Sequence, residues 1–290
     1  MTFYVIGNGF DRHYGLPTGY YDFKTFLLNN GYGELVHKID TLFYERGFSI
    51  NEVKWWSEFE NMLTVFAQLY ADDIYNEAMD NAETDDDRAG YWDSPAWNVG
   101  YYNQYIRILK EQFDSWIKTM DTSIHPDKYF SPKEGDCIVS FNYTQTIENN
   151  FNTFGVKIYH IHGTIGQEII LGHNEYQEPD YFSIIEDEGS DYRDTTCRKA
   201  VNDVLEQAVD QYYKNSPEVL RQYKHIFATI PEYDKVVFMG LSCGEQDAIY
   251  VQEIIKHAHH IDFYYRGETA RENMEYYSSH SSLSINYISW

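Results

Sequence analysis

Short apolar runs recur along the chain, and most of them stop at a glycine or an asparagine. Most have the length of a strand and no polar face, which is typical of strands buried on both sides within a parallel sheet. The runs cover residues 2–6, 137–141, 156–162, 169–171, 236–239, 261–265 and 283–287.

Apolar residues spaced by three and four positions predict helices between these runs. One helix is expected to begin near Tyr20, after a turn at 15–19, with Thr18 or Gly19 as its N-cap. The others are expected at about 56–74, 99–120, 197–213, 218–228 and 245–258.

Alternating strands and helices predict an α/β fold, with a Rossmann-like, mainly parallel sheet flanked by helices. The two long helices fall between the first and second strands. They predict a helical insertion at about 50–125 within a single domain of residues 1–290. The polar, acidic stretch 174–194 is expected to be a long loop, and loops of this length often act as lids.

The amino-acid composition excludes some classes of function. Hydrophobic residues make up 43% of the 290 and aromatic residues 18%, which is typical of a globular protein. Lys and Arg number 22 against 46 Asp and Glu, so the formal net charge is −24. Such a chain has no surplus of positive charge to neutralise phosphates, and we expect no direct binding of nucleic acid.

The cysteines Cys137, Cys197 and Cys243 form no CxxC pair. This pattern argues against a zinc ribbon and favours a reducing compartment. The N-terminal stretch does not resemble a signal peptide, and no apolar run reaches the length of a membrane span. We therefore expect a cytoplasmic protein that does not contact a membrane.

Four of the predicted strands end in polar residues suited to ligand binding. In open α/β sheets, ligands bind beyond the carboxyl ends of the strands. The segments are Gly7-Asn8-Gly9-Phe10-Asp11, Asn142-Tyr143-Thr144, His160-Ile161-His162-Gly163 and Gly240-Leu241-Ser242-Cys243-Gly244-Glu245-Gln246-Asp247. Together they predict a site along one edge of the sheet.

The first two segments suit a nucleotide. Gly7 and Gly9 would let backbone N–H groups approach a phosphate, although Arg12 occupies the place of the third glycine of a dinucleotide fingerprint. The alternative is an ordinary glycine turn. Asn142 would hold a ribose hydroxyl or orient a water, unless it serves as the cap of a helix at 144–150.

The last two segments offer groups for catalysis. His160 and His162 alternate along a predicted strand and should share one face, with His162 placed to act as a base near neutral pH. One alternative is that both histidines simply pack in the core. A two-histidine metal site is the other, but no acidic motif completes it and no metal is expected. Ser242, Glu245 and Asp247 would bond ligand hydroxyls or cap a helix.

A second enzymatic hypothesis comes from the pattern GxSxG at 240–244, which occurs in α/β hydrolases. It makes Ser242 a nucleophile and needs a base from the histidines that follow. These are His257, His259, His260 and His280.

Five strings resemble the AbiH family of bacteriophage abortive-infection proteins. They are IGNGFDRHYGLPTGYYDF at 6–23, WWSEFENML at 55–63, SFNYTQTIE at 140–148, YHIHGTIGQEIILGHN at 159–174 and FMGLSCGEQD at 238–247. The resemblance covers most of the chain in order, and the first string is quite specific. It implies a role in antiviral defence and a fold distantly similar to sirtuins, which bind NAD in a Rossmann-type domain.

By this resemblance, Asn142 and His162 are the catalytic residues. The implied cofactor-binding residues are Gly7, Gly9, Asp11, Ser242 and Asp247. The strand-end segments add Asn8, Thr144, Gly240 and Glu245 as further candidates for cofactor binding. The four-cysteine zinc module of protein deacylases is absent, so the implied activity is hydrolysis of NAD to nicotinamide and ADP-ribose. The alternative is a non-enzymatic nucleotide sensor or interaction protein of a defence system. A homo-oligomer or a phage-derived trigger is the further partner expected.

Overall fold

The computed structural model describes residues 1–45, 59–60, 63, 107–174, 198–199, 202, 206 and 212–290. Two compact units divide the chain. The first, called the sheet unit, contains Met1–Asp22, Asp114–Ile170 and Asn215–Trp290, and the second contains Phe23–Phe113 and Leu171–Lys214. Most of the predicted insertion at 50–125, the loop at 174–194 and the helix at 197–213 lie outside the described residues. The single domain stays a prediction.

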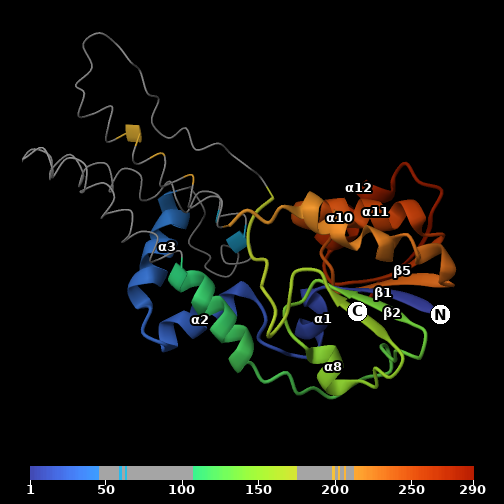
Figure 1. Ribbon diagram of the computed structural model, residues 1–290, viewed down its shortest axis with the longest axis horizontal. Helices are drawn as coiled ribbons and strands as arrows, with labels where there is room; N and C mark the ends of the chain where they lie inside the picture. Colours follow the sequence, from blue (N-terminus) through green and yellow to red (C-terminus); the bar gives the residue numbers. More distant parts are fainter. Residues whose placement is uncertain are drawn as a thin grey trace, which may run out of the picture. The chain divides into compact units, whose positions relative to one another are not determined.

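The described part of the sheet unit contains a six-stranded sheet in the order β3-β2-β1-β4-β5-β6 (Figure 1). Every pairing in it is parallel. This is the strand order of Rossmann folds, and it confirms the predicted α/β class. The strands are β1 (Thr2–Ile6), β2 (Cys137–Ser140), β3 (Lys157–His160), β4 (Lys235–Met239), β5 (His260–Tyr265) and β6 (Ser284–Ser289).

Helices cover both faces of this sheet (Figure 1). On one face lie α1 (Asn8–His13) and α8 (Thr146–Asn150), and on the other α10 (Ser216–Phe227), α11 (Ala248–His257) and α12 (Glu268–Ser278). Two short 3₁₀ helices, η2 (Ile230–Glu232) and η3 (Glu245–Asp247), flank β4.

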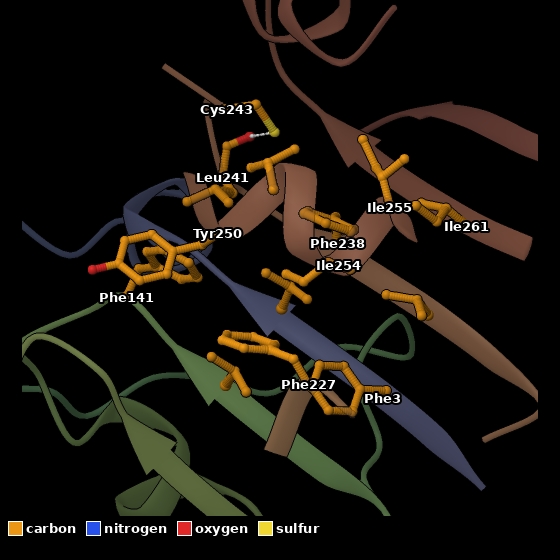
Figure 2. Close-up of a cluster of buried hydrophobic side chains, with 14 of the residues drawn as sticks. Phe3, Phe141, Phe227, Phe238, Leu241, Cys243, Tyr250, Ile254, Ile255 and Ile261 are labelled. Atoms are coloured by element: carbon orange, nitrogen blue, oxygen red, sulfur yellow. Dashed lines mark hydrogen bonds between the residues drawn. The ribbon is translucent and has the colours of Figure 1, made fainter. Parts of the chain in front are cut away.

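Alternating side chains of the central strands pack into two apolar cores, because successive residues of a strand point to opposite faces of the sheet. Phe3, Val139 and Phe238 belong to the larger core, which α10 to α12 complete (Figure 2). Ile6, Ile138 and Val237 belong to the smaller core, with Phe10 of α1 and Ile147 of α8. Burial on both sides explains why these strands are apolar throughout.

The helix predicted near Tyr20 is α2 (Tyr20–Asn29), which begins in the sheet unit and continues into the second unit. The Gly19 N–H donates to Asp22 Oδ2 at 2.9 Å, as in a capping box. The Thr18 hydroxyl has no hydrogen-bond partner, so Gly19 is the cap.

In the second unit, α2 is followed by α3 (Gly33–Glu45). Phe23 packs edge-on against Phe59 and Phe113, with ring centroids 5.9 and 5.2 Å away. Lys24 forms an ion pair with Asp40 at 2.8 Å.

Two strand predictions were wrong at the third and fourth runs. The third strand ends at His160, two residues early, because the chain turns there and the Gly163 N–H donates to the His160 carbonyl. Residues 169–171 form no strand. The Ile170 N–H donates to the His162 carbonyl at 2.9 Å, and the Tyr143 hydroxyl donates to the Ile170 carbonyl at 3.1 Å. Loop contacts therefore satisfy the backbone groups that a ladder would have paired.

Candidate functional site

The strand order brings the predicted site segments to one edge of the sheet. Strands β3, β2, β1 and β4 are consecutive neighbours, so the segments that follow them are adjacent as well. The order reverses between β1 and β4, and in open α/β sheets ligands bind at such a switch point.

Glycines allow the segments after β1 and β4 to touch at this switch point. The Gly9 N–H donates to the Gly240 carbonyl at 2.7 Å, and the Gly7 N–H donates to the Met239 carbonyl at 3.0 Å. A Cβ on Gly240 would lie 2.1 Å from the Phe10 nitrogen. These two N–H groups are engaged within the fold, and nucleotide binding by Gly7 and Gly9 stays a prediction.

No loop separates β1 from the next helix. Gly7 is the N-cap of α1, which starts at Asn8. The exposed Asn8 side chain donates from Nδ2 to the Thr18 carbonyl at 2.8 Å. Asn8 therefore ties the start of α1 to the turn before α2.

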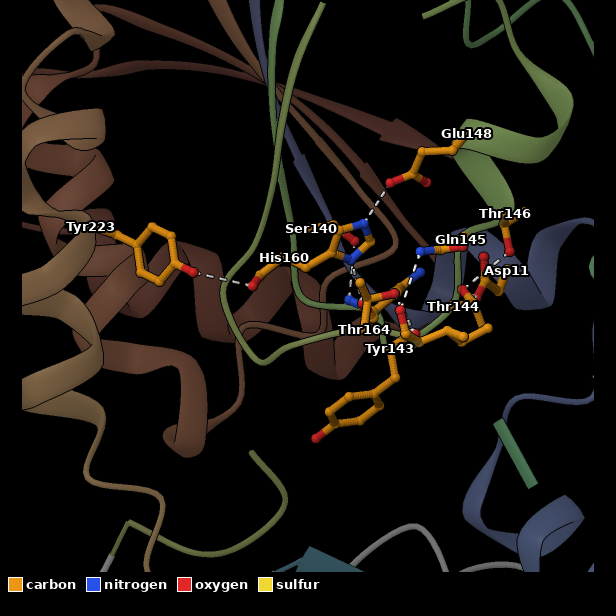
Figure 3. A network of polar contacts seen from close by, with 12 residues as sticks. Asp11, Ser140, Tyr143, Thr144, Gln145, Thr146, Glu148, His160, Thr164 and Tyr223 are labelled. Atoms are coloured by element: carbon orange, nitrogen blue, oxygen red, sulfur yellow. Dashed lines mark hydrogen bonds and ion pairs between the residues drawn. The ribbon is translucent and has the colours of Figure 1, made fainter. Parts of the chain in front are cut away.

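Asp11 of α1 is a buried carboxylate beneath the segment that follows β2, with only 1% of its surface exposed. The Thr144 hydroxyl donates to its Oδ2, and the Thr146 hydroxyl donates to the Thr144 oxygen at 3.1 Å (Figure 3). Burial raises the pKa of Asp11 to about 6, although the Thr144 hydrogen bond and the nearby polar side chains of Thr146 and Asn142 oppose the shift. Its other oxygen, Oδ1, is buried and has no hydrogen-bond partner.

Asn142, 6% exposed, is held by side chains on both sides of its backbone. Its N–H donates to Ser140 Oγ at 3.2 Å, and His160 Nδ1 contacts its carbonyl at 3.0 Å. Its side-chain Oδ1 is buried without a hydrogen-bond partner. The helix-cap alternative is wrong, because α8 begins at Thr146 with Gln145 at its N-cap position.

Asp11 Oδ1 and Asn142 Oδ1 are thus two buried acceptors on adjacent segments. Buried polar atoms in proteins nearly always have partners, so an unsatisfied one often marks a place where a ligand or water binds. Two such acceptors suit a ligand that offers hydroxyl donors.

His162 lies beyond β3, in the turn that Gly163 closes, and is 3% exposed. Three aromatic rings surround its imidazole. The ring centroids of Phe141, Tyr250 and Tyr143 are 5.3, 5.7 and 6.4 Å away. Because β3 has already ended, His162 does not share a strand face with His160, and that prediction was wrong.

His160, at the end of β3, is engaged on both sides of its ring. Nδ1 contacts the Asn142 carbonyl, and Nε2 lies 2.7 Å from Glu148 Oε1 of α8 (Figure 3). Burial alone lowers the pKa of His160. The hydrogen bonds to Glu148 and Asn142, with the charges of Glu148 and Asp11, outweigh burial and raise it above 6.5. Neither nitrogen offers a lone pair to a metal in this arrangement, which argues against the two-histidine metal site.

The segment after β4 presents Ser242 at the surface, where its carbonyl accepts a bond from Asn273 Nδ2 at 3.1 Å. Glu245 and Asp247 form η3, and Asp247 is the N-cap residue of α11 without a side-chain capping bond. Cys243 is fully buried in the larger core, its Sγ 3.9 Å from the Leu241 carbonyl (Figure 2). The ligand roles of Ser242, Glu245 and Asp247 stay predictions.

The hydrolase hypothesis based on GxSxG is wrong for this topology. Ser242 follows β4 at the carboxyl edge of the sheet. His257 ends α11, His259 and His260 lie at the start of β5, and His280 precedes β6. In a parallel sheet these positions lie at the opposite edge, so none of the four histidines can reach Ser242.

Sequence reasoning missed Glu148, Thr146 and Tyr250 as members of the site. Glu148 and Thr146 stand within the string SFNYTQTIE, but nothing in their spacing marks them. Tyr250 belongs to the apolar stripe of α11, so its pattern indicated only core packing.

A comparison with protein families identifies the chain. It matches the family described as "Bacteriophage abortive infection AbiH" over residues 3–265. The chain belongs to the AbiH family. The AbiH match extends from β1 to the end of β5 and includes every segment of the candidate site. Membership assigns the protein a role in abortive phage infection.

Other comparisons add no relative, because neither a curated protein nor a solved structure matches the chain. Among the residues that the structure describes, no helix combines the length and the apolar character needed to cross a membrane.

Proposed function

We propose that this AbiH protein binds NAD at the carboxyl edge of β1 to β4 and hydrolyses the bond between nicotinamide and ribose. The observation that supports this most is the pair of unsatisfied buried acceptors, Asp11 Oδ1 and Asn142 Oδ1, beside the switch point of a Rossmann sheet. His162 follows the strand next to that of Asn142.

In this mechanism the two acceptor oxygens receive hydrogen bonds from ribose hydroxyls and hold the sugar. The glycosidic C–N bond breaks toward an oxocarbenium-like state, and neutral nicotinamide leaves with the bonding electrons. A water adds to the anomeric carbon, and its proton passes to His162. Positioning of the sugar and water lowers the entropic part of the barrier, and a general base adds roughly 10²–10⁴-fold in rate.

Loss of NAD is consistent with abortive infection, because it stops the metabolism on which phage replication depends. Constitutive hydrolysis would also kill an uninfected host. We therefore propose that the activity awaits a trigger, either a phage product or self-association.

The test is incubation of the purified protein with NAD, alone and with lysate from phage-infected cells. We expect nicotinamide and ADP-ribose in equal amounts by chromatography. His162→Ala and Asn142→Ala should each lower turnover at least about a hundredfold, the low end for a lost general base. Melting curves of both variants show whether the fold survives.

A normally folded His162→Ala variant that still cleaves NAD at the parent rate would refute the catalytic assignment. Binding of NAD or ADP-ribose without cleavage under every condition would instead favour a nucleotide sensor. A ligand that binds only the folded state at about 100 times its Kd adds about 2.7 kcal/mol, so a melting curve detects it.

A further inference from the structure

The peptide groups on both sides of Asn142 are held by side chains instead of a sheet ladder. Asn142 stands two residues past the end of β2, where strand pairing has stopped. Ser140 Oγ accepts its N–H, and the His160 ring contacts its carbonyl. His160 faces Ser140 in the register of β2 and β3, so the two side chains approach Asn142 from paired positions.

Both neighbours of the His160 ring are acceptors. The Asn142 carbonyl has no proton to give, and Glu148 as a carboxylate has none either. A neutral imidazole donates from only one nitrogen, whereas an imidazolium donates from both. The two contacts, at 3.0 and 2.7 Å, are both hydrogen bonds to acceptors only if the ring is an imidazolium that donates to the Asn142 carbonyl and to Glu148.

We propose that His160 and Glu148 form a positioning pair that fixes Asn142 for the nucleotide. The inference rests on the proposed function, because Asn142 is the residue assigned there to the ribose and the water. The bridge ties the segment after β2 to α8 and to the end of β3, and so sets the direction of the Asn142 side chain beside Asp11.

The charged groups that face the imidazolium are Glu148 and, at longer range, Asp11. On the side of α10, the Tyr223 hydroxyl donates to the His160 backbone carbonyl at 3.3 Å and does not touch the ring (Figure 3). Glu148 is the partner that a substitution can remove without touching Asn142 or Asp11.

Two substitutions at His160 separate the two contacts. The amide nitrogen of Asn lies near the place of Nδ1, and that of Gln lies near the place of Nε2. His160→Asn should therefore keep the bond to the Asn142 carbonyl, while His160→Gln keeps only the contact with Glu148. Tyr223→Phe is the matched control, because it removes a bond to the same residue that does not involve the ring.

We expect His160→Gln to lower kcat for NAD at least tenfold, the effect of a lost hydrogen bond to a charged donor. His160→Asn and Glu148→Gln each keep a donor for the Asn142 carbonyl but break the bridge to α8, so they should lower kcat by a smaller factor, about threefold to tenfold. Tyr223→Phe should stay within about threefold of the parent. In Glu148→Gln a neutral imidazole still donates to the Asn142 carbonyl, and His160 should titrate at a lower pH than in the parent. Equal losses in the Asn and Gln variants, tracking their melting temperatures, would overturn the proposal in favour of a structural role.

A second readout does not depend on NAD cleavage. Nitrogen NMR of ¹⁵N-histidine protein, assigned with His160→Asn, should show both His160 nitrogens protonated at pH 7. A neutral His160 at that pH would overturn the inference even if NAD is cleaved. The protein could also bind no nucleotide, while His160 is an imidazolium and His160→Gln shifts the NMR signals of the Asn142 side-chain amide. That combination would support the positioning pair and refute only the proposed function.

Discussion

Asp11 is a charge in an environment that does not favour it. It is buried, one of its oxygens has no hydrogen-bond partner, and its pKa is raised to about 6. A carboxylate that lowers the stability of its own fold is frequently found at functional sites, where the charge serves the ligand. Asp11 therefore adds weight to a ligand at this edge of the sheet.

The raised pKa of Asp11 makes the folded protein less stable as the pH increases. Folding raises the pKa of Asp11 from 3.8 to about 6, so the folded protein retains a proton that the unfolded chain releases. The contribution to stability is fully present below about pH 4 and is lost as the pH rises through about 6. It amounts to about 3 kcal/mol, at about 1.4 kcal/mol per pKa unit.

Asp11→Asn should remove this dependence, since an amide oxygen still accepts from Thr144 but does not ionise. We expect the variant to gain unfolding free energy over the parent as the pH rises from 4 to 7, approaching about 3 kcal/mol. Urea denaturation of both proteins across this range measures the difference. Two stability curves that run parallel would show that Asp11 does not titrate as inferred.

Among the elements, the contact between the β1–α1 and β4–η3 connections governs the geometry of the switch point. Gly240 adopts a φ of 71°, and a Cβ there would meet backbone atoms of Gly9 and Phe10 at 2.1 to 2.7 Å. No side-chain rotation relieves such a clash. The two connections can approach this closely only because both are glycine at the contact.

Gly240→Ala should therefore lower the unfolding free energy by about 3 kcal/mol or more, the range of severe single substitutions. Gly166→Ala is the matched control for backbone strain, because Gly166 has a φ of 85° but open space around its Cβ position. It should cost only about 1 kcal/mol. Urea denaturation compares them, and equal losses in the two variants would mean that the contact between the connections is unimportant.

For the molecule as a whole, the net charge disfavours the binding of nucleic acids. A net charge of −24 repels the phosphate backbone, and association with nucleic acid depends on neutralising phosphates. A dinucleotide carries few phosphates and is held by local contacts, so this repulsion does not exclude NAD.

We accordingly expect no appreciable binding to random duplex DNA or RNA at physiological salt. Fluorescence anisotropy with labelled duplexes, at low and physiological salt, is the measurement. Sub-micromolar binding that weakens as salt increases would contradict this prediction and would indicate a basic surface that the overall charge conceals.

The sheet, most of its strand positions and the edge on which polar residues gather could all be predicted from the order of residues along the chain. Strands buried on both faces are apolar at every position, and the residues that stop them are read directly from the chain. The prediction of a strand at 169–171 was wrong because apolar residues can be buried without the hydrogen-bond ladder of a sheet. Its polar backbone groups bond to His162 and Tyr143 instead.

The assembly of the site could not be predicted in this way, because it depends on contacts between elements that are distant in the sequence. His160 and His162 are equivalent in a strand pattern, but a turn that begins at His160 places one beside Glu148 and the other among aromatic rings. The contact between Gly9 and Gly240 could not be predicted from the sequence either. The same holds for Glu148 beside His160 and Tyr250 beside His162. Each of these contacts joins residues from different elements, and such contacts leave no periodic trace along the sequence from which they could have been predicted.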